Sequence, residues 1–302
     1  MKSFSYLFLV KSQFIFLLYL SSLFTFGQSL ATEIIWVTDA PKNEVTDENK
    51  VIDIDTSTFN IIKATLNPKY TFTKLHMPVN RGFNLIQYSE NVCIGNKLST
   101  KERNKYSYNT EVAQTVFPGL RLYINKNSPY FDDVSQLVEK NNSISIHEII
   151  STKAQIKFGI VGGRSYGTEI DTLINSPENA HFFWKRHASK ANRGIVNMIE
   201  KERFDVSIEY PNVFGFYAQE ENSDIQSFAL KEAPDYMLGR ILCSKSKVSA
   251  ELIKDFSTAI QKASKTREYF DAHMQWFDRS SQVDAAKYYN EIYQTSFKLK
   301  KL

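Results

Sequence analysis

A glycine-rich turn at residues 162–167 (GGRSYG) is the stretch of this sequence whose residue types best suit ligand chemistry. It follows an apolar run at 158–161 and precedes an amphipathic run at 170–174, a pattern that predicts a strand, a tight turn and a helix. The first N–H groups of a helix have no partner within the helix, so such a turn attracts anions. Arg164 adds a positive charge and Tyr166 a flat ring. The turn is therefore either an anion-binding element or an ordinary structural turn.

The N-terminal residues 1–31 have the pattern of a secretory signal peptide. Lys2 and Lys11 precede an apolar stretch at 14–20 (FIFLLYL), and small residues lead up to Ala31. We expect cleavage after Ala31 and export to the periplasm; an uncleaved N-terminal anchor is the alternative. No later stretch approaches the roughly 18 apolar residues of a membrane-spanning helix.

The composition is that of a globular protein. The chain has 302 residues, of which 42% are hydrophobic and 23% charged, and this length allows one large or two medium domains. The formal charge is +4, and residues 1–31 carry two lysines and no acids, so the mature chain would carry +2. This balance gives no indication of nucleic-acid binding.

Two cysteines are present, Cys93 and Cys243. In an exported chain they can form one disulfide, or they can remain as two buried thiols. The sequence has neither a CxxC motif nor a Cys/His cluster, so we expect no metal site and no cofactor.

Strands and helices alternate in the first part of the chain. We expect strands at 33–38, 70–75 and 91–95, with helices at 55–66 and 78–87 between them. This βαβαβ order implies a parallel sheet with right-handed crossovers.

A second α/β unit follows, with an extended stretch at 115–124 that Pro118-Gly119 interrupts. Its expected later strands are at 155–161, 181–186, 204–209 and 227–230, the last at a sheet edge. A strand at 236–243 and helices between 250 and 297 end the chain. The sequence therefore predicts two α/β units and a helical C-terminal tail.

Three motifs in this order resemble the family 3 bacterial extracellular solute-binding proteins. They are a T-x-x-R motif at Thr100 and Arg103 after the third strand, the GGRSYG turn, and DVSIEYP at 205–211. The resemblance covers residues 34 to 275 and rests on order and spacing. It implies the type II periplasmic binding fold, an α/β architecture of two lobes around a cleft, in a protein that we expect to be a monomer.

The resemblance also implies where the lobes begin and end. Lobe 1 would consist of 32–125 and 235–302, and lobe 2 of 126–234. The two hinge segments would lie near Asn125 and Pro234. The Cys93 strand would lie antiparallel to the strand that ends at Cys243, which supports a disulfide within lobe 1.

In the family, the arginine of T-x-x-R holds the α-carboxylate of the ligand, a task for which the guanidinium fork is well suited. Arg103 matches this arginine. The turn residues Arg164, Ser165 and Tyr166 match the position that donates to the same carboxylate from the other lobe. The alternative for Arg103 is an ordinary surface arginine.

The ligand's ammonium is bound in the family by an acidic residue just after a later strand of lobe 2. Glu209 occupies that place, with Tyr210 beside it, although the family residue is usually Asp. The alternative for Glu209 is a glutamate exposed to solvent at a strand end.

Other positions depart from the family pattern. The loop after the first strand begins Asp39-Ala40-Pro41 in place of an aromatic-rich segment, and Arg81 adds a further arginine near the cleft. Trp36 is either a cleft aromatic or a core residue. The arginines suggest a ligand more anionic than a standard amino acid, or a pocket no longer used for transport.

Three functions fit this pattern. The first is a periplasmic protein that closes on a small carboxylate-bearing, amino-acid-like solute and presents it to an ABC permease. The second is a ligand-sensing or partner-binding module that acts through a membrane receptor. The third is an exported dehydratase-like enzyme; against it, the five histidines match no catalytic spacing and no Ser/His/Asp or Cys/His arrangement is visible.

Overall fold

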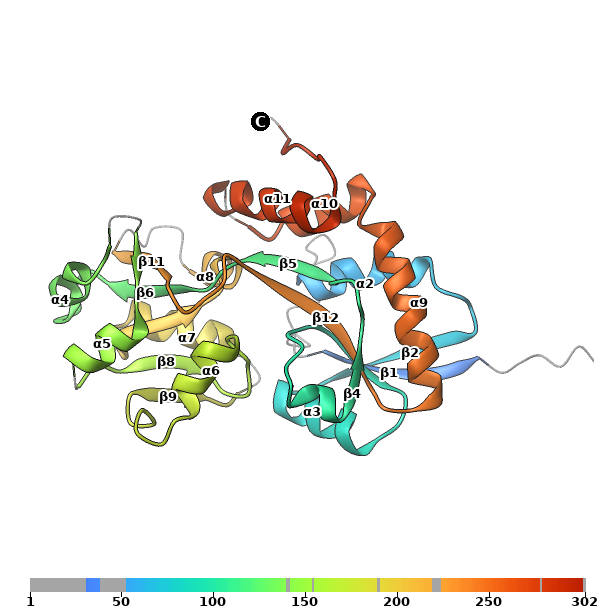
Figure 1. Cartoon of the computed structure of the whole chain (residues 1–302), viewed down its shortest axis with the longest axis horizontal. Helices are drawn as coiled ribbons and strands as arrows, with labels where there is room; N and C mark the ends of the chain where they lie inside the picture. Colours follow the sequence, from blue (N-terminus) through green and yellow to red (C-terminus); the bar gives the residue numbers. More distant parts are fainter. Residues whose placement is uncertain are drawn as a thin grey trace, which may run out of the picture. The chain divides into compact units, whose positions relative to one another are not determined.

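A computed structural model describes residues 31–38, 53–139, 142–153, 155–188, 191–218, 224–277 and 279–300. The expected signal peptide therefore lies outside the described residues up to residue 30, and so does Asp39. Residues Glu33–Leu302 form one compact unit. Within it, two β-sheets lie side by side, each covered by helices (Figure 1).

The first sheet contains the predicted βαβαβ unit. Its elements are β1 (Thr32–Thr38), α2 (Ile54–Ala64), β2 (Tyr70–His76), α3 (Val79–Tyr88) and β3 (Val92–Lys97). Strand β1 pairs with β3 in parallel, as predicted. The Asp53 side chain accepts the Thr56 N–H at 2.6 Å, and this N-cap explains why α2 begins here.

The first sheet is completed by strands from elsewhere in the chain. Strand β12 (Tyr236–Ser244) is antiparallel to β3, and β4 (Ser107–Asn109) and β5 (Thr115–Pro118) pair with β12. Cys93 of β3 lies directly opposite Cys243 of β12, and the two form a disulfide. The predicted pairing of the two cysteines is confirmed.

The chain crosses between the two sheets twice. It leaves β5 at Pro118 and enters the second sheet at β6 (Arg121–Asn125), and it returns between β11 (Ile225–Leu230) and β12. The Gly119 N–H donates to the Asp235 carbonyl at 2.8 Å, so the crossings are hydrogen-bonded to each other. A Cβ at Gly119 would lie 2.2 Å from the Pro234 carbonyl oxygen, which explains the glycine.

The expected hinge near Asn125 is therefore placed too late. Asn125 is the last residue of β6, which is a strand of the second sheet, and the first crossing is at residues 119–120. The second crossing, residues 231–235, includes Pro234 as expected. The Pro118-Gly119 break is the sequence signal for the first crossing.

The second sheet has the strand order β7-β11-β6-β10-β8-β9. Its further elements are α4 (Phe131–Gln136), β7 (Ser143–Ile144), α5 (Ile146–Thr152), β8 (Phe158–Val161), α6 (Thr168–Asn175), β9 (Phe183–Arg186), α7 (Ala191–Glu200), β10 (Val206–Glu209) and α8 (Pro211–Tyr217). The prediction that 227–230 forms an edge strand is wrong, because β7 pairs on the outer side of β11. A strand of two residues is too short to show a periodic pattern.

The C-terminal tail forms α9 (Lys247–Ala263), α10 (Arg267–Met274) and α11 (Arg279–Tyr293), and α10 and α11 lie above β5 in Figure 1. Two buried hydroxyls attach the tail to the segment before β5: Tyr269 donates to the Gln114 carbonyl at 2.6 Å and Tyr293 to the Ala113 carbonyl at 2.8 Å. Among the described residues, none of the helices is long and apolar enough to cross a membrane.

His273 in α10 is a buried histidine that makes stability depend on pH. Its Nδ1 lies 2.9 Å from the Tyr269 carbonyl, and its Nε2 has no hydrogen-bond partner among the described residues. Burial lowers the pKa of His273 from 6.5 to about 4. The unfolded chain therefore binds a proton between these values that the native protein does not bind.

We expect the free energy of unfolding to fall by roughly 3 kcal/mol as the pH is lowered from 6.5 to 4, in addition to the contributions of other groups. Chemical denaturation at a series of pH values would measure this fall. The His273→Phe variant should lack this component, and equal slopes for the two proteins would contradict the assignment.

Candidate functional site

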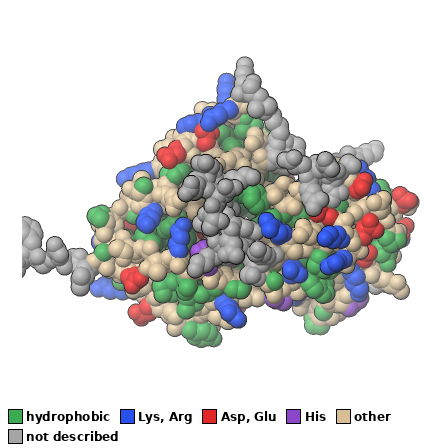
Figure 2. Space-filling model, turned by 180° about the vertical axis from the view of Figure 1, so that it is seen from behind, with side chains coloured by type: hydrophobic (Ala, Val, Ile, Leu, Met, Phe, Trp, Pro, Cys, Tyr) green, Lys and Arg blue, Asp and Glu red, His purple; other side chains and the backbone are tan. Residues whose placement is uncertain are grey.

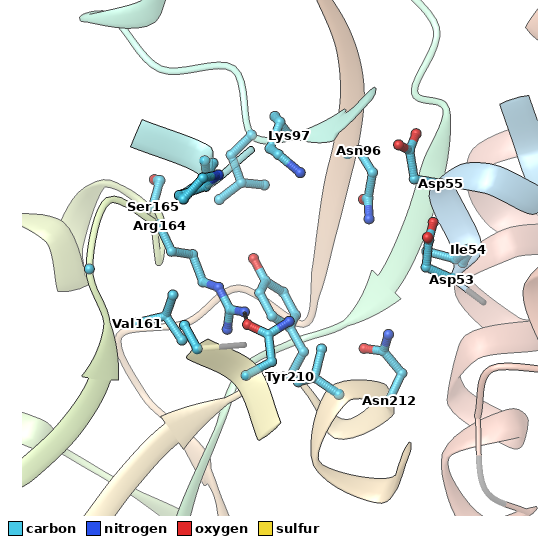
Figure 3. Close-up of a pocket in the computed structure, with 18 of the residues that line it drawn as sticks. Asp53, Ile54, Asp55, Asn96, Lys97, Val161, Arg164, Ser165, Tyr210 and Asn212 are labelled. Atoms are coloured by element: carbon cyan, nitrogen blue, oxygen red, sulfur yellow. Dashed lines mark hydrogen bonds between the residues drawn. The ribbon is translucent and has the colours of Figure 1, made fainter. Parts of the chain in front are cut away.

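A cleft of about 630 Å³ is lined by residues from the ends of both sheets. Figure 3 shows Arg164, Tyr210 and Asn212 facing the hollow from elements of the second sheet. Asn96, Lys97, Asp53 and Asp55 lie on the first-sheet side.

Arg103 is a buried cation at this cleft. It begins the short 3₁₀ helix η2 (Arg103–Lys105), and its side chain lies against the Phe83 ring, with Cζ 4.0 Å from the ring centroid. Its Nη1 donates to the Leu98 carbonyl at 2.8 Å, and its Nη2 lies 3.4 Å from the Gly163 carbonyl oxygen of the second lobe. The Thr100 hydroxyl accepts the Arg103 N–H at 3.2 Å and so shapes the turn.

Arg103 is a buried residue and not a surface residue. The residue is 8% exposed, and within the described structure it forms no salt bridge. Burial lowers the pKa of its guanidinium below the ordinary value. The surface-arginine alternative is therefore wrong, and the predicted contact with a ligand carboxylate remains a prediction.

The glycine-rich turn forms as predicted, but the Tyr166 N–H and the Ser165 hydroxyl are already paired. The Tyr166 N–H donates to the Asp171 carboxylate at 2.7 Å, and the Ser165 hydroxyl donates to the same carboxylate. Gly163 has φ of +79°, and a Cβ there would lie 1.4 Å from Asn80 Oδ1 of α3, so both backbone and packing require glycine. The Asp171 carboxylate of α6 thus occupies two of the donors that we expected to face a ligand.

Tyr166 does not face the cleft. Its side chain is 1% exposed, and its hydroxyl accepts the Val161 N–H at 2.7 Å. The prediction that it offers a flat surface to a ligand is wrong, because the ring packs in the hydrophobic core. Ser165 does line the cleft.

Arg164 and Glu209 form a buried ion pair. Arg164 Nη1 bonds to Glu209 Oε1, and its Nη2 donates to Asn192 Oδ1 at 2.6 Å. Burial by itself lowers the pKa of Arg164, but the adjacent Glu209 carboxylate more than offsets this and raises it above the ordinary value. Burial also leaves the pKa of Glu209 raised, although Arg164 and the Tyr210 N–H, 2.8 Å from Oε1, oppose the shift.

Glu209 is therefore neither exposed nor open to a ligand. Its side chain is completely buried, and Oε2 has no hydrogen-bond partner among the described residues. The predicted role as ammonium acceptor is not supported, because Glu209 neutralises Arg164 behind the cleft wall. Tyr210 does line the cleft, and its ring lies 5.6 Å from that of Phe117.

Of the remaining predicted residues, Arg81 lines the cleft and Trp36 does not. Arg81 is exposed and lines the cleft. Trp36 is 1% exposed and stacks on Phe59 with ring centroids 3.7 Å apart, so it is a core residue and the cleft-aromatic prediction is wrong. The alternation of apolar side chains along β1 predicts that one face of the strand is buried, but it does not tell whether helices or the cleft cover that face.

The structure adds residues that the sequence analysis missed. His187 Nδ1 lies 3.4 Å from Asn80 Nδ2 of the first lobe, and both line the cleft. Asn212 and Trp276 also line it. Asn212 directly follows the Tyr-Pro turn after the DVSIE strand and was recognisable by position, whereas Trp276 belongs to the helical tail, where no pattern indicates a cleft.

Cations outnumber acids along the cleft wall. The basic residues are Arg81, Lys97, Arg103, Arg164 and Arg186, against Asp53 and Asp55. Asp53 caps α2, and Asp55 Oδ1 accepts from Gln114 Nε2 at 2.9 Å, so both acids already have partners within the first lobe. The described residues contain no group of three or more His, Cys, Asp or Glu side chains that could hold a metal ion.

Charged side chains are spread over the face of the molecule that Figure 2 shows. On the face seen in Figure 2, Lys and Arg side chains are interspersed with polar and apolar ones and do not form a continuous band. Nucleic-acid binding by a folded domain depends on basic residues gathered on one face.

No family model matches the sequence, and no curated protein matches it. Solved structures do match. One is a probable amino-acid ABC transporter extracellular-binding protein from Bacillus subtilis, with 17% identity and a TM-score of 0.54, over 83% of this chain and 99% of that one. Another is an arginine-, lysine-, histidine-binding protein from Geobacillus stearothermophilus, with 14% identity and a TM-score of 0.57, over 82% and 95%.

A third match is a histidine kinase sensor domain with similarity to periplasmic binding proteins, with 12% identity and a TM-score of 0.59, over 82% of this chain and 97% of that one. At these identities the likeness concerns the fold. It extends over nearly the whole of each matched structure, and the order of elements agrees with the resemblance seen in the sequence. This chain therefore has the α/β fold of the type II periplasmic binding proteins, as found in bacterial amino-acid-binding proteins.

Proposed function

We propose that this chain is an exported, periplasmic solute-binding protein that closes its lobes on a small carboxylate-bearing solute and presents it to an ABC importer. The observation that carries the proposal is the position of Arg103. Its buried guanidinium lies at the cleft, contacts a backbone carbonyl of each lobe, and has no salt-bridge partner among the described residues.

Burial of a charge without a direct ion-pair partner is costly, and a guanidinium fork binds a carboxylate through two parallel hydrogen bonds. The Asp171 carboxylate favours the charged form of Arg103 but forms no salt bridge with it. A ligand carboxylate at Arg103 would supply the direct partner and would lie between the two lobes. Ligand binding would therefore stabilise the closed arrangement, which is how hinged binding proteins respond to solutes.

The cleft favours an acid over a standard zwitterionic amino acid. Glu209, the expected ammonium acceptor, is paired with Arg164, and Asp53 and Asp55 have partners within their own lobe. Arg81 and Arg186 add positive charge to the wall. We infer that the solute carries more negative than positive charge, as dicarboxylates and acidic amino-acid derivatives do.

The structural likeness to a kinase sensor domain supports a second candidate, a sensing module that acts through a membrane receptor. Both candidates use the same cleft and predict the same ligand response. They differ in the partner. A transport protein would support ligand-dependent uptake into vesicles that contain the cognate permease. A sensor would instead cause ligand-dependent signalling by a receptor.

We expect an acidic solute to raise the melting temperature of the wild-type protein and Arg103→Ala to remove that rise, because the charge that receives the carboxylate is gone. A thermal-shift screen of dicarboxylates, amino acids and small peptides would identify the solute. Titration calorimetry should then show that Arg103→Ala weakens binding by at least about tenfold, the equivalent of one charge-assisted hydrogen bond.

Arg267→Ala is the matched control, because Arg267 pairs with Asp271 on α10, outside the cleft. This variant should bind the solute as the wild type does. A full ligand response in a folded Arg103→Ala protein would overturn the assignment of the site.

A further inference from the structure

Asn96 lies in the cleft wall with a backbone conformation that few residue types adopt. It is near the end of β3, lines the cleft, and has φ of +51°. Asn is one of the non-glycine residues that tolerate this left-handed region best. Backbone of this kind is concentrated at ligand sites, where the surrounding structure holds it in place. Hydrogen bonds to both the backbone and the side chain hold Asn96 in this conformation.

A buried polar chain fixes the backbone of Asn96 from behind the cleft wall. The Asn96 N–H donates to Gln114 Oε1 at 2.8 Å, and Gln114 Nε2 donates to Asp55 Oδ1 at 2.9 Å. Gln114 and Asp55 are both buried. Because the Asp55 carboxylate fixes which end of Gln114 donates, the Gln114 oxygen faces Asn96 and holds its N–H.

The side chain of Asn96 is oriented so that its oxygen is enclosed and its nitrogen faces the cleft. Oδ1 accepts the Thr115 hydroxyl at 2.7 Å, a length typical of O–H···O bonds and shorter than most N–H···O bonds. A Cβ at Gly239 would lie 2.5 Å from Asn96 Oδ1, so the backbone of β12 closes off that side. Nδ2 has no hydrogen-bond partner among the described residues and is not one of their buried unpaired atoms, and Figure 3 shows the Asn96 side chain directed into the hollow. Asn96 therefore presents N–H donors to a solute.

This amide lies close to the guanidinium of Arg103. Arg103 Nη1 donates to the Leu98 carbonyl at 2.8 Å, and Leu98 follows Asn96 by two residues. Two residues of extended chain span at most about 7 Å. A solute whose carboxylate binds to Arg103 can therefore place the next group of its skeleton at Asn96.

We propose that Asn96 binds an oxygen substituent next to the solute carboxylate, so that the solute is a 2-oxo or 2-hydroxy acid and not a 2-amino acid. Asn96 Nδ2 would donate to the carbonyl or hydroxyl oxygen. An ammonium group at the same place would set donor against donor, because Thr115 occupies Asn96 Oδ1. Glu209, the expected ammonium acceptor, is paired with Arg164. This inference rests on the proposed function, which places the carboxylate at Arg103.

The test compares three acids that share a five-carbon dicarboxylate skeleton. 2-Oxoglutarate carries an oxygen acceptor at C2, glutamate an ammonium group, and glutarate only hydrogen atoms. We expect calorimetry on the wild-type protein to show roughly tenfold tighter binding of 2-oxoglutarate than of glutarate, as expected for one hydrogen bond, and the weakest binding for glutamate. Equal affinities for the three acids, or a preference for glutamate, would overturn the inference.

Asn96→Asp is the most informative variant, because it replaces the donor by an acceptor at the same place. Aspartate tolerates the left-handed backbone as asparagine does, so the variant should fold. We expect it to bind glutamate more tightly than 2-oxoglutarate, the reverse of the wild type. Asn84→Asp is the matched control, since Asn84 is exposed on α3 and does not line the cleft. The control should keep the wild-type order of the three acids, and an Asn96→Asp protein that also keeps it would contradict the assignment of Asn96.

Thr115→Val tests the orientation of the Asn96 amide. Without the hydroxyl the amide can turn and present its oxygen, so we expect the ratio of the affinities for 2-oxoglutarate and glutamate to fall toward one. A ratio equal to that of the wild type would show that Thr115 does not position the amide.

Arg103→Ala separates this inference from the proposed function. If 2-oxoglutarate binding depends on Arg103 but the three acids bind equally, the contact with Asn96 is wrong and the carboxylate site stands. If the preference for 2-oxoglutarate depends on Asn96 and its binding is unaffected by Arg103→Ala, the carboxylate site is wrong and the contact with Asn96 stands. If none of the three acids binds to the wild type, both are wrong.

Discussion

Arg164→Ala is expected to lower the free energy of unfolding by about 3–5 kcal/mol, the largest effect that we expect from a single substitution in this protein. The substitution removes the counter-ion of Glu209, whose side chain is completely buried and whose Oε2 already has no hydrogen-bond partner among the described residues. The cost comes from the isolated carboxylate and not from the lost bond itself.

The double variant Arg164→Met/Glu209→Leu distinguishes the cost of an isolated buried carboxylate from the loss of the ion pair itself. Replacing a buried ion pair by apolar residues is often neutral or stabilising, since both desolvation costs disappear together. We therefore expect the double variant to recover most of the stability that Arg164→Ala loses, as measured by chemical denaturation. A double variant less stable than Arg164→Ala would show that the pair itself stabilises the second lobe.

A surface pair provides the control. Lys153 contacts Asp133 at 2.7 Å, but both side chains are partly exposed. Lys153→Ala should change the free energy of unfolding by less than about 1 kcal/mol, because exposed ion pairs are screened by water and salt.

Loss of the disulfide should be at least as costly. The bond between Cys93 and Cys243 closes a loop with a sequence separation of 150 residues. Closing a loop of this length restricts the unfolded chain, so we expect the Cys93→Ala/Cys243→Ala variant to lose about 5 kcal/mol. Both residues are completely buried, and alanine avoids burying new hydroxyl groups.

Denaturation with and without a reducing agent checks this result. The wild type should lose stability on reduction, and the double alanine variant should not respond. The β3–β12 pairing that the bond joins is also held by backbone hydrogen bonds, so the variant should still fold in the cold. Equal stability of the reduced and oxidised wild type would contradict the prediction.

Much of the fold follows from local patterns in the sequence. Apolar runs bounded by Asp, Pro and Gly predict the alternation of strands and helices, because cap and turn residues act within a few positions of each other. Pro118-Gly119 breaks the extended stretch where the first crossing lies, but the sequence analysis placed that crossing near Asn125. The place of Arg103 came from the family resemblance and not from a local pattern; Arg103 does line the cleft, and its contact with a ligand stays a prediction.

The pairing of the two cysteines depends on which strands are neighbours in the sheet. Two cysteines permit a bond but do not indicate that their strands are neighbours. Once the returning strand is placed antiparallel beside β3, Cys93 and Cys243 become direct partners. Only the family resemblance predicted that these two strands are neighbours.

Whether each predicted site residue lines the cleft, is buried in the core or is ion-paired depends on the tertiary structure alone. Arg164 and Glu209 are 45 residues apart, and their pairing turns a predicted ligand acceptor into an internal counter-ion. Tyr166 and Trp36 are buried where a ligand contact was expected, and Trp276 reaches the cleft from the C-terminal tail. Periodicity tells which residues share a face, but desolvation and charge pairing depend on neighbours that are distant in the chain, so only the folded arrangement distinguishes cleft from core.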